Sequence, residues 1–322
     1  MSEPKEKAAP VAAGSGFQSE LDSNTVDRTF SSRESEGQAE SLRGDTAAAV
    51  SFLQRWEPNG QWLLSAIIPD GAIETRTFHD EQKAHAWIEN YQGKRNLYFS
   101  ANRASYDLGK KATKADMGHA LAAHVDIDPI KGRPLEAERE RIRAVVETME
   151  PAPSVVIDSG GGYQCFWQLR EALPLANGVL ERVEAINQML ERRYGGDRCG
   201  SIDHIMRLPG TVNLPTAKKR EAGRLPAVAC VVRHYTDRLY GLEDFGLEKV
   251  EALPVSKRVR ELILGVGASP DRSADLFAAL LGLVSAGCSE EDMTAIVLDP
   301  ALYISGHLLD KPDPRAEVST PE

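Results

Sequence analysis

The pattern of apolar and polar positions along the chain predicts a folded body between two polar ends. Residues 1–45 are rich in Ser, Glu, Ala and Gly and almost free of aromatic residues, a composition typical of a disordered leader. From residue 46 to about 250, apolar residues recur at strand and helix spacing, and over 251–310 only helical spacing follows. Residues 311–322 are again polar, which predicts a disordered tail.

Within residues 46–250 strands and helices alternate. Helices are expected at 47–56, 81–91, 134–149 and 175–194. Strands are expected at 62–68, 73–78, 96–102, 121–128, 154–157, 163–169, 205–208 and 227–232. This order predicts an α+β fold in which a mixed sheet is covered by helices. The later region predicts a small all-α module with helices at 256–264, 273–286 and 289–297, each opened by a serine that can cap it.

Two acidic residues stand out in the apolar run over residues 122–129, which is typical of a buried strand. Successive strand residues point to opposite faces, so Asp126 and Asp128 share one face. Two like charges near the end of a buried strand persist only where a cation or a proton offsets them, and a divalent metal is the expected cation. Asp-x-Asp is a short pattern, and a strand end with solvated acids is the alternative.

A glycine-rich turn separates the strands expected at 154–157 and 163–169. Three consecutive glycines, Gly160–Gly162, let backbone N–H groups approach an anion, so the turn can cradle a phosphate. Ser159 and Gln164 add side-chain donors. A plain hairpin turn is the alternative, and the lysine of a P-loop is missing.

A third segment combines an acid with several bases. Asp203 is followed by Arg207, and the turn at Pro209 and Gly210 then leads towards a basic cluster. A carboxylate near a guanidinium and lysines suits a site that holds metal ions together with a triphosphate. A structural ion pair between Asp203 and Arg207 is the alternative.

The charge distribution leaves room for a nucleic-acid partner despite a formal net charge of −10. Residues 1–45 carry −4 and residues 243–322 carry −8, which leaves +2 for the body between them. The body's bases gather near Lys114 and at Lys218, Lys219, Arg220 and Arg224. Phosphate contacts are expected from Lys114 and from Lys218–Arg220, although solvated surface lysines would give the same pattern.

The chain is expected to be cytoplasmic. Its apolar runs are shorter than the roughly 20 residues that cross a bilayer, and its first thirty residues lack an apolar signal core. The 4 cysteines form no Cys-x-x-Cys pair, which argues against a zinc ribbon and fits reduced thiols.

Three segments in this order resemble the three motifs of the archaeo-eukaryotic primase superfamily. They are VDIDP at 125–129, SGGGYQCFW at 159–167 and DHIMRLPGTVN at 203–213. The chain is most similar to the prim-pol domains of phage and plasmid replication proteins, and the resemblance covers about residues 46–235. It implies an RNA-recognition-motif-like catalytic sheet joined to a smaller α/β subdomain and followed by the helical module.

The resemblance also implies roles for individual residues. Asp126, Asp128 and Asp203 would be the catalytic residues that bind two Mg²⁺ or Mn²⁺ ions. The expected nucleotide-binding residues are Ser159, Gly160, Gly161, Gly162, Gln164 and Arg207. The expected nucleic-acid-binding residues are Lys114, Lys218, Lys219 and Arg220. The superfamily usually has a histidine where this chain has Gln164, which can donate a hydrogen bond but cannot become cationic.

The expected function is a metal-dependent primase-polymerase that makes or extends primers from NTP or dNTP on single-stranded DNA during replication of a phage or mobile element. Such domains are often fused to a helicase, so a helicase fused or associated on the C-terminal side is an expected partner. One alternative is an inactive nucleic-acid-binding replication module, which the glutamine at 164 favours. Another is a different Asp-x-Asp enzyme, such as a glycosyltransferase that uses a nucleotide sugar.

Overall fold

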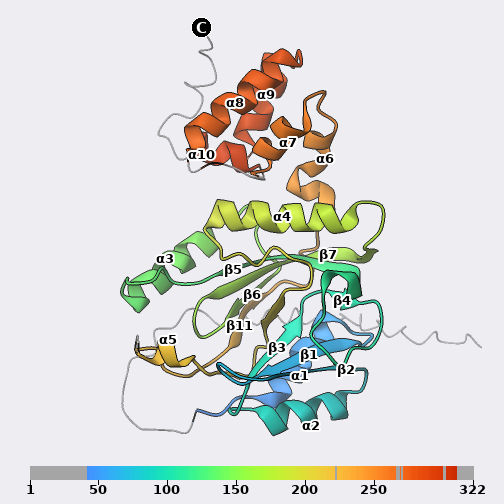
Figure 1. The fold of residues 1–322 in the computed structure, drawn as a ribbon, viewed down its shortest axis with the longest axis vertical. Coiled ribbons are helices and arrows are strands. Elements are labelled where there is room, and N and C mark those ends of the chain that lie inside the picture. Colours follow the sequence, from blue (N-terminus) through green and yellow to red (C-terminus); the bar gives the residue numbers. More distant parts are fainter. Residues whose placement is uncertain (1–41, 222, 266–268, 270, 300–301, 310–322) are drawn as a thin grey trace, which may run out of the picture.

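The computed structural model describes residues 42–309 except 222, 266–268, 270 and 300–301. The expected disordered leader lies almost wholly outside the described residues, and the expected tail lies wholly outside them. Figure 1 shows a layered molecule. The C-terminal helices lie at one end, followed by α4 (Val179–Tyr194) and then by two sheets of four and five strands. At the other end are α1 (Thr46–Trp56) and α2 (Glu81–Tyr91). The predicted α+β class is confirmed.

In the described part of the chain, the smaller of these two sheets has the strand order β2-β1-β3-β8, and neighbouring strands are antiparallel. Its strands are β1 (Trp62–Ile67), β2 (Ile73–Phe78), β3 (Asn96–Ser100) and β8 (Ile205–Arg207). Helices α1 (Thr46–Trp56) and α2 (Glu81–Tyr91) pack on it. Each begins after an aspartate, Asp45 or Asp80, whose side chain accepts a backbone N–H of the first turn.

The larger sheet has the order β11-β6-β7-β5-β4 and is also antiparallel. A third, two-stranded sheet pairs β9 (Val212–Asn213) with β10 (Ala227–Val228), so neighbouring strands are antiparallel in all three described sheets, whereas the order of strands and helices predicted a mixed sheet. Its strands are β4 (Arg103–Ala104), β5 (Met117–Ile127), β6 (Val155–Asp158), β7 (Tyr163–Pro174) and β11 (Cys230–His234). Helices α3 (Leu135–Glu147) and α4 (Val179–Tyr194) follow β5 and β7. The remaining short elements here are η1 (Lys114–Asp116), β9 (Val212–Asn213), α5 (Ala217–Glu221), β10 (Ala227–Val228) and η2 (Leu242–Phe245).

The strand expected at 227–232 is interrupted, because its two halves pair with different partners. Ala227 and Val228 pair with β9, whereas β11 pairs with β6. Between them Ala229 exchanges backbone hydrogen bonds with Gly210 and Thr211.

The larger sheet is buried on both faces, and the alternation along β5 decides which way its acids point. Val125 and Ile127 enter the core that contains α3 and α4, whereas Ala122 and Phe166 enter the core shared with the smaller sheet. Asp126 is four residues after Ala122 and so points to the same face of the strand, where it is paired with Gln164 of β7. It therefore faces the smaller sheet, near the end of the strand.

The C-terminal helices pack against the side of α4 that is turned away from the sheet (Figure 1). They are α6 (Leu247–Glu251), α7 (Lys257–Ile263), α8 (Arg272–Ser285), α9 (Glu290–Leu298) and α10 (Gly306–Leu309), with η3 (Tyr303–Ser305). Ser256 and Ser289 cap α7 and α9 as predicted, but Asp271 caps α8 in place of Ser273. The predicted domain boundary at residue 250 falls inside α6 and stays a prediction. Within the described ranges, no helix is long and apolar enough to cross a membrane.

Candidate active site

A cavity of about 160 Å³ lies where the ends of β5 and β7 meet β3 and β8. It collects residues from all three sequence segments singled out above. The predicted site residues that line it are Asp126, Asp128, Ser159, Gly160, Gly161, Gln164, Arg207 and Lys219. Lining residues that sequence reasoning did not assign to the site include Asn96, Tyr98, Asn213 and Arg224.

The acidic pair Asp126 and Asp128 forms one side of the cavity. Although Asp126 as a residue is partly exposed, its Oδ1 is buried and has no hydrogen-bond partner among the described residues. Burial, and then the charge of Asp128, raises the pKa of Asp126 to about 7. Asp128 is more exposed, and one of its oxygens lies 3.5 Å from Nζ of Lys219.

These two carboxylates fit a divalent cation. A buried oxygen without a partner carries a desolvation cost that a cation would offset, and carboxylate oxygens are the hard ligands that Mg²⁺ and Mn²⁺ prefer. A bound cation would also hold Asp126 in its ionised form despite its burial. The Asp126–Asp128 pair is therefore suited to the metal that its spacing predicted.

Asp203 does not join this pair. The loop that contains it runs along β5 from the end of the strand towards its middle, starting where Asp197 N donates to Asp126 O at 2.8 Å. Further along, Ile202 O accepts from Asn102, whose side chain also accepts the backbone N–H of Ala122. Ala122 precedes Asp126 by four positions, or roughly 13 Å of strand.

The predicted cluster of three carboxylates is consequently not formed. Among the described residues, no group of three or more His, Cys, Asp or Glu side chains could hold a metal ion. The Asp203 carboxylate accepts a hydrogen bond from Ser201 instead. The acid nearest to the pair from this loop is Asp197, whose pKa is raised by burial and then by the charge of Asp128.

Arg207 supplies a fixed positive charge opposite the acids. It is 6% exposed, and its guanidinium donates to Asn96 Oδ1 at 2.9 Å, to Tyr98 OH at 2.8 Å and to Asn213 Oδ1 at 3.1 Å. The guanidinium also lies over the Tyr98 ring, 4.1 Å from its centroid. Burial lowers the pKa of Arg207. These contacts, and not the ion pair with Asp203 that was considered, hold the side chain.

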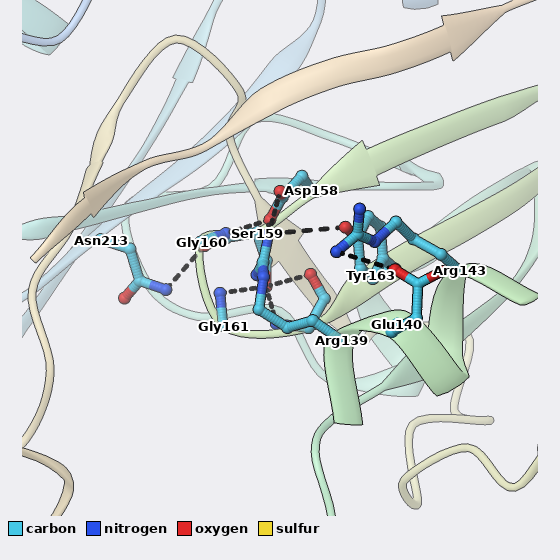
Figure 2. Close-up of polar contacts among 10 residues, drawn as sticks. Arg139, Glu140, Arg143, Asp158, Ser159, Gly160, Gly161, Tyr163 and Asn213 are labelled. Atoms are coloured by element: carbon cyan, nitrogen blue, oxygen red, sulfur yellow. Dashed lines mark hydrogen bonds and ion pairs between the residues drawn. The ribbon is translucent and has the colours of Figure 1, made fainter. Parts of the chain in front are cut away.

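The glycine turn is held from both sides, as Figure 2 shows. Asp158, just before it, binds Arg139 of α3 at 2.5 Å and accepts Gly160 N at 2.8 Å. Ser159 Oγ accepts the N–H groups of Gly161 and Gly162, at 3.3 and 3.0 Å. All three glycine N–H groups thus have partners inside the turn, as in the hairpin alternative, so a phosphate in this cavity would rely on the cationic side chains.

The glycine turn also contacts Asn213 and Arg224, which line the cavity. Asn213 Nδ2 donates to Ser159 O at 2.7 Å while its Oδ1 accepts from Arg207. On the outer side, a β-carbon on Gly161 would lie 2.2 Å from an Nη of Arg224, so this second guanidinium rests against the turn. Arg224 was named in the basic cluster from the sequence but was not assigned to a site.

The predicted nucleic-acid-binding residues do not all gather at the cavity. Lys219 lines it, whereas Lys218 and Arg220 are exposed on the same short helix α5 and are not among the lining residues described. Lys114 is on η1 and binds Glu184 of α4 at 2.7 Å. A contact between Lys114 and the template stays a prediction without support from this geometry.

Comparison with known proteins places the chain in a family. A profile of the RepB DNA-primase N-terminal domain matches residues 62–248, more than half of the chain. The chain belongs to this family. The matched range of the RepB primase domain contains both larger sheets, α3, α4, the acidic pair and every residue that lines the cavity.

Two solved structures are similar to this chain at low sequence identity. The AEP domain of the cyanophage S-2L primase-polymerase is 15% identical, with a TM-score of 0.45, over 62% of this chain and 96% of that chain. The catalytic domain of primase RepB′, solved in complex with initiator DNA, is 15% identical, with a TM-score of 0.39, over 64% and 96% of the two chains. No curated protein sequence matches.

Proposed function

We propose that this domain is a metal-dependent primase-polymerase that synthesises or extends primers on single-stranded DNA. The proposal rests on the buried, unpartnered Oδ1 of Asp126, which lies beside Asp128 in a cavity that also contains Arg207, Lys219 and Arg224. Acids for a cation and bases for phosphates in one cavity are what nucleotidyl transfer requires. Membership of a primase family agrees with this combination.

The acidic pair would hold Mg²⁺ or Mn²⁺. When bound, the cation supplies charge compensation for the phosphates and lowers the pKa of an attacking 3′-hydroxyl. Arg207 presents a guanidinium whose position is already fixed by Asn96, Tyr98 and Asn213, so little reorganisation is needed when an NTP or dNTP enters.

The remaining bases would serve phosphates further from the acidic pair. Lys219 balances Asp128 in the present geometry and would turn to the triphosphate once a cation takes over that role. Lys218 and Arg220 are exposed on the same helix, where template phosphates could reach them. A helicase on the C-terminal side remains part of this proposal.

A template-directed incorporation assay with Mg²⁺ or Mn²⁺ tests the proposal. Asp126→Asn keeps the size of the side chain but removes its charge, and we expect it to lower incorporation at least 100-fold because a metal ligand is lost. The matched control is Asp237→Asn, an exposed acid in a turn outside the cavity, which should incorporate at the parental rate.

Thermal melting of both variants shows whether they are folded. Incorporation by Asp126→Asn at the parental rate under saturating Mg²⁺ would refute the metal role of this acid. If the parental protein binds single-stranded DNA but incorporates nothing with either metal, the inactive replication module is the better description.

A further inference from the structure

Gln164, which stands where the superfamily usually has a histidine, is held between the two larger sheets. It is 4% exposed and lies on β7 directly opposite Asp126 of β5. Its Nε2 donates to Asp126 Oδ2 at 3.0 Å, and its Oε1 accepts the backbone N–H of Arg207 at 2.9 Å. One amide therefore bridges β7 and β5 of the larger sheet to β8 of the smaller one.

The hydrogen bonds fix the orientation of this amide. A backbone N–H can only donate, so the atom that faces Arg207 N must be the amide oxygen, and the NH₂ group must face Asp126. Gln164 is thereby committed at both ends, although it lines the cavity. The NH₂ group carries a second hydrogen, so the bond to Asp126 does not by itself prevent a hydrogen bond to a phosphate in the cavity.

The contact with Asp126 determines which oxygen is left for a cation. Because Oδ2 is held by Gln164, rotation of the carboxylate is restricted, and Oδ1 is the oxygen without a partner. A neutral amide achieves this without cancelling the negative charge of Asp126. A cationic side chain at the same 3.0 Å would neutralise the carboxylate and oppose cation binding.

We propose that Gln164 is a positioning residue that sets the rotation of the Asp126 carboxylate and the placement of Arg207. This inference rests on the proposed function for its catalytic meaning. Groups that orient a metal-ligating carboxylate typically contribute 10- to 100-fold to metal affinity. Loss of Gln164 is consequently expected to weaken cation binding.

The test separates cation binding from nucleotide binding in the full chain. Mn²⁺ affinity is measured without nucleotide by electron paramagnetic resonance, and the KM for nucleotide is measured at saturating Mn²⁺. For Gln164→Met, which has the same length and no polar end, we expect Mn²⁺ affinity to fall at least 10-fold and KM to change less than 3-fold. The matched control is Gln168→Met, on the same strand and outside the cavity lining, which should leave both unchanged.

A second variant guards against misfolding, since methionine leaves the N–H of Arg207 unpaired. Gln164→Asn keeps an amide but is one methylene shorter, so it cannot span from Asp126 to Arg207, and we expect a loss of Mn²⁺ affinity here too. Unchanged Mn²⁺ affinity in a folded variant overturns the proposal, and a 10-fold rise in KM with it shows that Gln164 contacts the nucleotide. The Mn²⁺ measurement stands even if the parental protein incorporates no nucleotide, so the two proposals fail separately.

Discussion

A methyl group added at Gly162 tests how tightly the glycine turn packs against the end of β5 and Asp128. The ideal β-carbon would lie 2.2 Å from the carbonyl oxygen of Ile127, 2.7 Å from Oδ1 of Asp128 and 3.0 Å from Asp128 Cα. Ordinary contacts are about 3.5 Å, so the turn and the end of β5 must separate by roughly 1 Å. Two of these three atoms are backbone atoms that cannot rotate away.

Gly162→Ala should therefore affect both stability and catalysis. Overpacking of this kind typically costs about 1–3 kcal/mol of unfolding free energy. Moving Asp128 by about 1 Å is expected to lower incorporation roughly 100-fold, because reacting groups tolerate little misplacement. Urea denaturation followed by tryptophan fluorescence gives the first quantity, and the template-directed assay gives the second.

Gly109→Ala is the matched control. Gly109 also lacks a positive φ, it is exposed, and a β-carbon there would meet nothing within 4 Å. Its variant should stay within about 0.5 kcal/mol of the parental unfolding free energy and keep parental activity. The reasoning is refuted if Gly162→Ala matches Gly109→Ala in both assays, because the turn would then be free to shift without disturbing Asp128.

Two further predictions concern Lys219 and His234. Replacing Lys219 by methionine removes the positive charge that lies beside Asp128, so Mn²⁺ affinity without nucleotide should rise, by about fivefold at most for so exposed a pair, while the KM for nucleotide increases. Calorimetry measures the Mn²⁺ affinity, and steady-state kinetics give the KM. A fall in Mn²⁺ affinity would contradict the proposed role of Lys219. Burial, and then Arg55, lowers the pKa of His234 to about 4. Because the unfolded chain binds the proton more tightly, stability is lost as pH falls from about 6.5 towards 4. His234→Gln should reduce the loss between pH 7 and pH 5 by about 1–2 kcal/mol in urea denaturation, and an unchanged pH dependence would argue against a buried neutral histidine.

The sequence pattern predicted most helices and strands, and two of the three predicted acids line the cavity. Strand alternation predicted that Asp126 and Asp128 share a face, and both line the cavity. The helix expected at 81–91 has those bounds, because its aspartate cap and apolar face lie close together in the sequence. The cap of α8 was wrong by two residues, because the helix begins at Arg272 and Asp271, the residue before it, accepts the N–H groups of Ser273 and Ala274.

Contacts between the sheets could not be predicted in this way. Asp203 was expected beside the pair from its place in a motif, but the path of the loop along β5 brings Asp197 there instead. The role of Gln164 likewise depends on β8 joining β3 in the other sheet, a pairing between residues far apart in the sequence. Neither periodicity nor spacing carries that information.

The late arrival of β8 has a consequence during protein synthesis. Strands β2, β1 and β3 are made consecutively, but the edge of β3 that pairs with β8 has no partner until residues 205–207 follow. A ribosome that adds about 5–20 residues per second needs about 5–20 s to make the intervening stretch of roughly 100 residues. Throughout that time the open edge exposes the backbone around Leu97 and Phe99, as an unpaired strand edge prone to association with other nascent chains. Slower translation therefore lengthens the period in which this edge has no partner strand.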